Sequence, residues 1–109
     1  MRILFDQGTP APLRHGLPGH TVVTAHERGW AGPDNGRLLE AAEAEFDAFV
    51  TTDQNLRYQQ SAARRRLAIL VLPTTSWPKI QLHVQLVAAA VAALAPGDFV
   101  DLQFPARDE

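Results

Sequence analysis

Short apolar runs alternate with segments of helical spacing along the whole chain. Runs of consecutive or alternating apolar residues predict strands over 2–6, 20–26, 47–52, 67–72 and 98–104. Spaced apolar residues with polar residues between them predict helices over 10–16, 35–45, 55–66 and 77–94. Strands that alternate with helices are typical of an α/β fold, so we expect one mostly parallel sheet of about four to five strands, flanked by helices.

Three segments carry more specific expectations. The run 67–72 is the most apolar strand, which favours the centre of the sheet, whereas the imperfect alternation over 98–104 predicts an edge strand. The helix over 77–94 is expected to be continuous, with one apolar face formed by Ile80, Val84, Val87, Val91 and Leu94. Thr9 is expected to cap the helix over 10–16, with Pro10 at its first position.

Composition narrows the class of protein. The 109 residues fit one domain, expected over 1–104 with a loose tail over 105–109, and 46% hydrophobic residues exclude a wholly disordered chain. The chain has no cysteine, which excludes disulfides, zinc–thiolate sites, iron–sulfur clusters and thiol nucleophiles. A formal net charge of −2 excludes a uniformly basic surface. The most apolar run, 80–95, is interrupted by polar residues and is too short for a membrane span, so we expect a soluble, cytoplasmic protein.

Two aspartates stand where predicted strands end. Asp6 follows Ile-Leu-Phe and Asp53 follows Phe-Val-Thr-Thr. If these two strands are neighbours in a parallel sheet, both carboxylates project into one crevice, where a divalent cation would relieve their repulsion. Mg²⁺ and Mn²⁺ prefer such oxygen ligands. The alternative is that both aspartates are helix N-caps.

The residues around Asp53 offer further oxygen groups. Thr51 or Thr52 could donate a hydrogen bond that orients a carboxylate. Asn55 is either a neutral oxygen ligand or part of a turn and helix cap.

These motifs together resemble the PIN-like family, and more narrowly its small bacterial toxin-type branch. The resemblance rests on Ile3-Leu4-Phe5-Asp6, Gly16, Val22-Val23-Thr24, Leu38-Leu39-Glu40-Ala41-Ala42 and Phe49-Val50-Thr51-Thr52-Asp53-Gln54-Asn55-Leu56. It implies an α/β/α sheet whose acids hold Mg²⁺ or Mn²⁺ for hydrolysis of RNA phosphodiester bonds. It assigns metal binding and catalysis to Asp6 and Asp53.

The chain departs from the family pattern at several positions. Asn35 and Asn55 stand where the family usually has acids, and we expect them to complete the catalytic site or orient water. Gln7 and Gly8 replace a frequent Glu and Asn. Other acids available to the site are Asp34, Glu40 and Glu43. An active ribonuclease and a catalytically degenerate module that binds RNA or protein are therefore both open.

A basic segment follows Asp53. Arg57, Tyr58, Arg64 and Arg65 fall on the predicted helix over 55–66, and Arg57 and Arg64 share one face because they are seven residues apart. Guanidinium groups could hold RNA phosphates while Tyr58 stacks on a base. The alternative is an ordinary solvated helix face.

The family resemblance also predicts a protein partner, and the fold pattern allows one other class of protein. The resemblance implies the toxin of a toxin–antitoxin pair, with a small antitoxin as partner and possible homodimer formation. The helix over 77–94 offers a face for such contacts; the alternative is that this face is part of the core.

A receiver-like signalling module is the alternative class. Such a module needs two adjacent acids after the first strand and a lysine after the last, but Gln7 follows Asp6 and the one lysine is Lys79.

Overall fold

The computed structural model describes residues 1–30, 35–56 and 65–105, with five strands and four helices in these ranges. The strands are β1 (Arg2–Phe5), β2 (Thr21–Thr24), β3 (Ala48–Thr51), β4 (Ala68–Val71) and β5 (Phe99–Asp101). The helices are the 3₁₀ helix η1 (Ala11–Gly16) and the α-helices α1 (Asn35–Glu45), α2 (Trp77–Leu82) and α3 (Val84–Ala92). The predicted α/β class is confirmed.

The sheet is wholly parallel, and its strand order is β2-β1-β3-β4-β5. Leu4 of β1 lies opposite Val23 of β2 on one side and Phe49 of β3 on the other. The chain therefore leaves β1 for β2, then crosses back to β3 on the far side of β1. This reversal makes the gap between β1 and β3 the topological switch point, where ligands bind in open α/β sheets.

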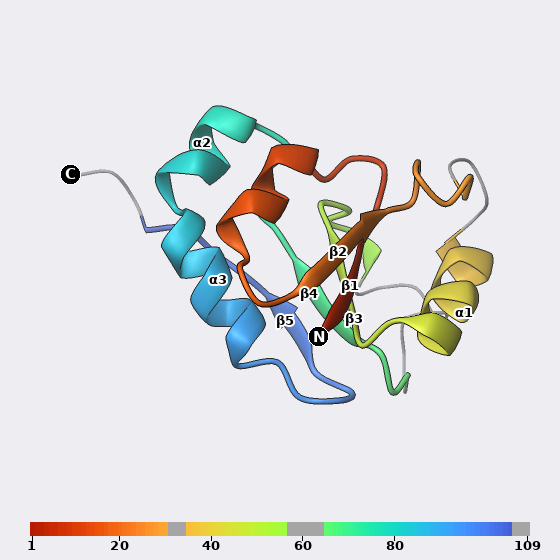
Figure 1. The fold of residues 1–109 in the computed structure, drawn as a ribbon. Coiled ribbons are helices and arrows are strands. Elements are labelled where there is room, and N and C mark those ends of the chain that lie inside the picture. The colour runs from red at the N-terminus through yellow and green to blue at the C-terminus, as the bar shows by residue number, and fades with distance from the viewer. Residues whose placement is uncertain (31–34, 57–64, 106–109) are drawn as a thin grey trace.

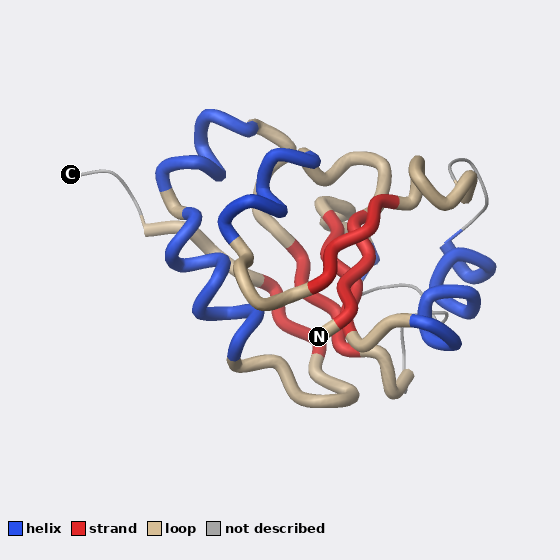
Figure 2. The backbone as a smooth tube through the Cα atoms, in the orientation of Figure 1, coloured by secondary structure: helices blue, strands red, loops and turns tan. Residues whose placement is uncertain are grey.

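Helices cover both faces of the sheet (Figures 1 and 2). One face packs against η1, α2 and α3 through buried residues that include Phe5, Leu13, Val50, Leu70 and Val87. The other packs against α1 through a second core, formed by Leu4, Leu38, Leu39, Ala42, Phe49, Leu56 and Ile69 among others. Strands buried on both faces need consecutive apolar residues, which explains the uninterrupted runs of the sequence.

Gly16 allows η1 and α3 to pack closely together over the first face of the sheet. A Cβ on Gly16 would lie 2.3 Å from Cγ1 of Val84, so η1 and α3 can approach this closely only with glycine at this position. η1 therefore packs directly against α3.

Several predicted boundaries need correction. The helix predicted over 77–94 is two helices, because His83 leaves helical geometry (φ −125°, ψ 26°) and its ring stacks on Phe104 at 4.5 Å. Thr9 does not cap η1; Pro10 takes the cap position and the Thr9 hydroxyl bonds elsewhere. The centre of the sheet is β3, with β4 beside it, whereas the edge position of β5 is confirmed.

Some expectations fall wholly or partly outside the described residues. Of the helix predicted over 55–66, residues 57–64 are not described. Of the described residues, Asn55 lies in a turn, Leu56 has 3₁₀ geometry, and Arg65 and Arg66 are not helical. The end of the predicted tail, 106–109, is not described either. Over the ranges that the structure does describe, the helices are too short or too polar to cross a bilayer.

Candidate metal centre at the carboxyl edge of the sheet

The structure places Asp6 and Asp53 at one edge of the sheet. Asp6 directly follows β1, and Asp53 lies two residues after β3. Because β1 and β3 are parallel neighbours, both aspartates stand at the carboxyl ends of adjacent strands, beside the switch point. The adjacency on which the sequence hypothesis depended is confirmed.

Two threonine hydroxyls hold the Asp6 carboxylate. Thr9 Oγ1 donates to Oδ1 at 2.6 Å, and Thr51 Oγ1 donates to Oδ2 at 2.5 Å. The Asp6 backbone is fixed as well, because its N–H donates to the carbonyl of Val50 at 3.1 Å. A carboxylate has about four lone-pair sites, so each Asp6 oxygen can accept a further donor or a cation.

Thr51 also connects Asp6 to Asp53. The buried Thr51 hydroxyl accepts the backbone N–H of Asp53 at 3.0 Å while it donates to Asp6. Asp53 Oδ1 in turn accepts the backbone N–H of Asn55 at 2.9 Å, which is the bond of an Asx turn. Asn55 therefore has the turn role that was one of its two interpretations, and its exposed side chain is available for the other.

The neighbouring loops are fixed by Gln54 and Gly8. The Gln54 amide donates to the carbonyl of Leu72, at the end of β4, and to that of Thr52 at 3.2 Å. A Cβ on Gly8 would lie 2.7 Å from Thr52 Oγ1 and 4.0 Å from Asp6 Oδ1. A side chain at position 8 would therefore collide with the Thr52 hydroxyl, so the close approach of this loop to the edge requires glycine.

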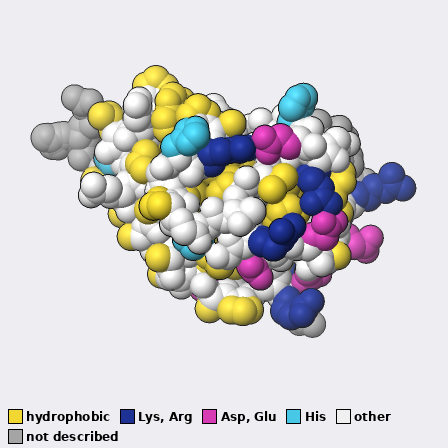
Figure 3. Space-filling model, viewed as in Figure 1, with side chains coloured by type: hydrophobic (Ala, Val, Ile, Leu, Met, Phe, Trp, Pro, Cys, Tyr) yellow, Lys and Arg dark blue, Asp and Glu magenta, His cyan; other side chains and the backbone are white. Residues whose placement is uncertain are grey.

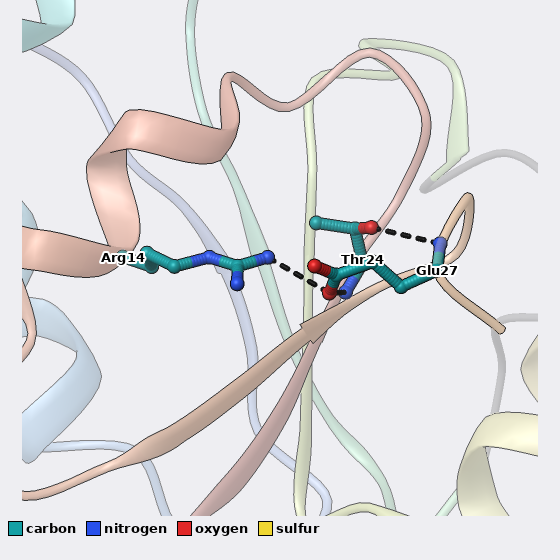
Figure 4. Close-up of polar contacts among 3 residues, drawn as sticks. All are labelled: Arg14, Thr24 and Glu27. Atoms are coloured by element: carbon teal, nitrogen blue, oxygen red, sulfur yellow. Dashed lines mark hydrogen bonds and ion pairs between the residues drawn. The ribbon is translucent and has the colours of Figure 1, made fainter.

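A second carboxylate network lies farther along the same edge, after β2 (Figure 4). Glu27 Oε1 accepts from Arg14 Nη2 and from the Thr24 backbone N–H, both at 2.9 Å, and the Glu27 N–H donates to Thr24 Oγ1. The hydrogen bonds from Arg14 and Thr24 lower the pKa of Glu27 from its ordinary 4.5 to about 2. Sequence reasoning missed this network, although Thr24 and Glu27 have the three-residue spacing of a capping box.

The Glu43 carboxylate is hydrogen-bonded at the opposite edge of the sheet. Its carboxylate accepts the backbone N–H groups of Arg66 at 2.6 Å and Leu67 at 3.4 Å, and it pairs with Arg65 at 3.2 Å. Partial burial raises the pKa of Glu43, but these bonds outweigh it and the pKa falls below its ordinary value. Because Leu67 immediately precedes β4, Glu43 lies at the amino edge and does not join Asp6 and Asp53.

This geometry also places Arg65 away from the aspartates. Arg65 lies before β4, at the amino edge, and is bonded to Glu43. The other residues of the predicted RNA-binding set, Arg57, Tyr58 and Arg64, are outside the described residues. Figure 3 shows basic and acidic side chains interspersed toward α1, while the surface over α2 and α3 is mostly uncharged. The RNA-binding role of this segment stays a prediction.

A hollow of about 600 Å³ lies at the amino edge, lined by residues that include Glu43, Asp47, Arg66 and Leu94. Neither Asp6 nor Asp53 lines it, and its three acids have partners. Asp47 accepts the Arg2 N–H at 2.8 Å, Glu45 pairs with Arg28 at 2.5 Å, and Glu43 has the bonds given above. The hollow is therefore separate from the candidate metal centre.

The donor set suits a hard cation. Among residues 1–30, 35–56 and 65–105 no group of three or more His, Cys, Asp or Glu side chains lies close enough together to hold one metal ion. Glu27, at the same edge, is bonded to Arg14, so the candidate site consists of Asp6 and Asp53. Asn35 begins α1, but its side chain is outside the described part. Carboxylate and amide oxygens fit Mg²⁺ or Mn²⁺, which retain several waters and need few protein ligands.

Comparisons of the chain with protein-family models, with curated proteins and with solved structures found no significant match. A function for this chain is therefore inferred from the motifs of its sequence and from the geometry of Asp6, Thr51 and Asp53.

Proposed function

We propose that this protein is a metal-dependent, PIN-like ribonuclease that hydrolyses phosphodiester bonds in RNA. The observation that carries the proposal is the position of Asp6 and Asp53 after the neighbouring parallel strands β1 and β3, with Thr51 bonded to both. Two acids beside the switch point of a parallel sheet form a site for a cation and a phosphate.

Asp6 and Asp53 would hold Mg²⁺ or Mn²⁺, and Asn35 and Asn55 would complete the site or orient water. Such an ion, when bound, polarises a phosphate and lowers the pKa of a coordinated water. The protein's own contribution is orientation. Thr9 and Thr51 fix the Asp6 carboxylate, and the bond from Asp53 N–H to Thr51 fixes the start of the loop that carries Asp53.

We also propose a protein partner for this chain in the cell. The sequence resemblance supports the toxin of a toxin–antitoxin pair in the cytoplasm, with a small antitoxin as partner and with possible homodimers. The exposed side chains of Leu82 (72% exposed) and Leu86 (37%) lie on α2 and α3 and offer an uncharged contact surface. This surface supports a protein partner without identifying it.

A catalytically degenerate PIN-like module is the second candidate. It is favoured because, among the described residues, no third His, Cys, Asp or Glu side chain joins Asp6 and Asp53 in a group that could hold a metal ion. Such a module would bind RNA or protein through the same edge without hydrolysis. Metal-dependent cleavage separates the two candidates.

The test is cleavage of a mixed RNA pool by the purified protein with Mg²⁺ or Mn²⁺. We expect wild type to cleave, and we expect excess EDTA or Asp53→Asn to abolish cleavage. Asp53→Asn purified in parallel also controls for a contaminating nuclease. Intact RNA with wild type at millimolar metal, or equal cleavage by wild type and Asp53→Asn, would overturn the ribonuclease proposal.

A further inference from the structure

Of four threonine hydroxyls at the carboxyl edge, three form hydrogen bonds within the described part of the protein, and the fourth does not. Thr9 and Thr51 donate to Asp6, and Thr24 accepts the N–H of Glu27. The half-buried Thr52 forms no side-chain hydrogen bond to any residue of the described ranges. Its hydroxyl is therefore available to a ligand.

The backbone that carries the Thr52 hydroxyl is also held in place. The Thr52 carbonyl accepts a hydrogen bond from the Gln54 side chain, which is anchored in addition on the carbonyl of Leu72. The Thr52 hydroxyl and Asp6 Oδ1 both lie within 4.0 Å of the point that a Cβ on Gly8 would occupy. Gly8 is exposed and has no side chain, so no Cβ at position 8 covers either oxygen.

A phosphate at this edge needs donors as well as a cation. Carboxylates only accept hydrogen bonds, so Asp6 and Asp53 cannot bind phosphate oxygens directly. A hydroxyl can donate to such an oxygen, and hydroxyl contacts to phosphates are a standard way in which proteins position nucleic acids.

We infer that Thr52 is an RNA-binding residue whose hydroxyl donates a hydrogen bond to a phosphate oxygen of RNA bound beside Asp6. The inference rests on the proposed function for the identity of the ligand. It assigns Thr51 and Thr52, adjacent in sequence, to different tasks. Thr51 faces inward and orients Asp6, and Thr52 contacts the substrate.

The test compares Thr52→Val, which keeps the branched shape without the hydroxyl, with Thr52→Ser, which keeps the hydroxyl. Thr21→Val is the matched control, because Thr21 is an exposed strand threonine at the opposite edge. RNA affinity is measured by fluorescence anisotropy of a labelled RNA oligonucleotide with Ca²⁺, and the KM and kcat of cleavage are measured with Mn²⁺. Thermal unfolding checks that each variant folds.

We expect Thr52→Val to weaken RNA affinity about tenfold and to raise KM by a similar factor, as for the loss of a hydrogen bond to a charged group. Thr52→Ser and Thr21→Val should stay within about twofold of wild type, well below that loss. Wild-type affinity of Thr52→Val, equal losses in Thr52→Val and Thr52→Ser, or no RNA binding by wild type would each overturn the inference. If wild type binds RNA in the expected Thr52-dependent way but does not cleave it, the ribonuclease proposal fails and the Thr52 contact stands.

Discussion

Asp6 and Glu27 follow neighbouring strands at the same edge of the sheet, yet their surroundings differ in charge. Glu27 is bonded to the Arg14 guanidinium and to a backbone N–H, and these bonds lower its pKa to about 2. Within the described ranges, Asp6 accepts side-chain hydrogen bonds from the hydroxyls of Thr9 and Thr51 alone. The arginine balances the charge of Glu27, whereas neutral hydroxyls orient Asp6 and leave its charge in place.

The presence or absence of an arginine partner separates acids with a structural role from Asp6, the candidate metal ligand. Glu43, at the amino edge, repeats the pattern of Glu27, because it pairs with Arg65 and accepts two backbone N–H groups. An acid that the protein neutralises internally stabilises the fold. An acid that is oriented but not neutralised is suited to an external cation.

The largest expected effect is that of Asp6→Asn on RNA cleavage. The amide keeps the shape of the side chain, and the neighbouring hydroxyls can accept as well as donate, so the fold should persist. The loss of one of two charged ligands should lower metal-dependent cleavage by about a hundredfold or more, judged against the tenfold to hundredfold cost of merely indirect changes at metal sites. The measurement is the initial rate with Mn²⁺.

Glu27→Gln is the control for Asp6→Asn, because it removes a carboxylate charge from the same edge. We expect its cleavage rate to match that of wild type. Equal losses in the two variants would show that the general negative charge of the edge matters, and the distinction between the two acids would be wrong.

Thr51→Val tests the orientation of Asp6. It removes the donor to Asp6 Oδ2 and the acceptor for Asp53 N–H without a change of shape. We expect Mn²⁺ affinity to fall about tenfold, as for other changes to groups that orient metal ligands, with a loss of about 1–2 kcal/mol in the free energy of unfolding. Calorimetric titration and chemical denaturation measure the two quantities.

Thr24→Val is the matched variant on β2, where Thr24 lies opposite Phe5, the residue before Asp6. It removes the acceptor for Glu27 N–H and should also destabilise the fold, but it should leave Mn²⁺ affinity unchanged. A similar loss of Mn²⁺ affinity in both variants would mean that affinity follows stability rather than the orientation of Asp6.

Glu43→Ala should affect stability alone. It leaves the N–H groups of Arg66 and Leu67 without their acceptor at the start of β4, so we expect a loss of about 1–2 kcal/mol in the free energy of unfolding. Denaturant titration measures this loss. Unchanged stability, or weaker Mn²⁺ binding, would argue against a purely structural role.

The smallest expected effect is that of Glu27→Gln on stability, and it depends on pH. The pKa of Glu27 falls from 4.5 to about 2 on folding, so its ionised form stabilises the protein fully above pH 4.5, and this stabilisation is lost as the pH falls toward 2. Wild type should therefore have a slightly higher Tm than Glu27→Gln at pH 7, because solvent screens this exposed ion pair, and the difference should shrink near pH 2. A difference in Tm that does not change with pH would contradict the assignment.

Much of the fold could be predicted because local patterns determine it. The buried strands contain consecutive apolar residues, and the helix expected over 35–45 matches α1. The break at His83 could not be predicted, because no glycine or proline marks it and the apolar positions Ile80, Val87 and Val91 continue across it into the same core. His83 stacks on Phe104, a partner that only the tertiary structure brings near.

The site was predicted in part, for a similar reason. The positions of Asp6 and Asp53 followed from the residues at strand ends. The sequence left the orienting hydroxyl open between Thr51 and Thr52, and the structure shows that Thr51 donates to Asp6. The role of Thr9 was missed because its local sequence is that of a helix cap, whereas its hydroxyl bonds Asp6 and lies 3.1 Å from the Val50 carbonyl. The engagement of Glu43 at the amino edge depends on contacts more than twenty residues away along the chain.

The most direct test of the central claim, that Asp6 and not Glu27 is a metal ligand, is Mn²⁺ titration of the folded protein followed by electron paramagnetic resonance of free Mn²⁺. The account predicts one site in wild type, the same affinity in Glu27→Gln, and an affinity lower by at least about tenfold in Asp6→Asn. Equal Mn²⁺ binding by wild type and Asp6→Asn, or no binding by wild type at millimolar Mn²⁺, would contradict it.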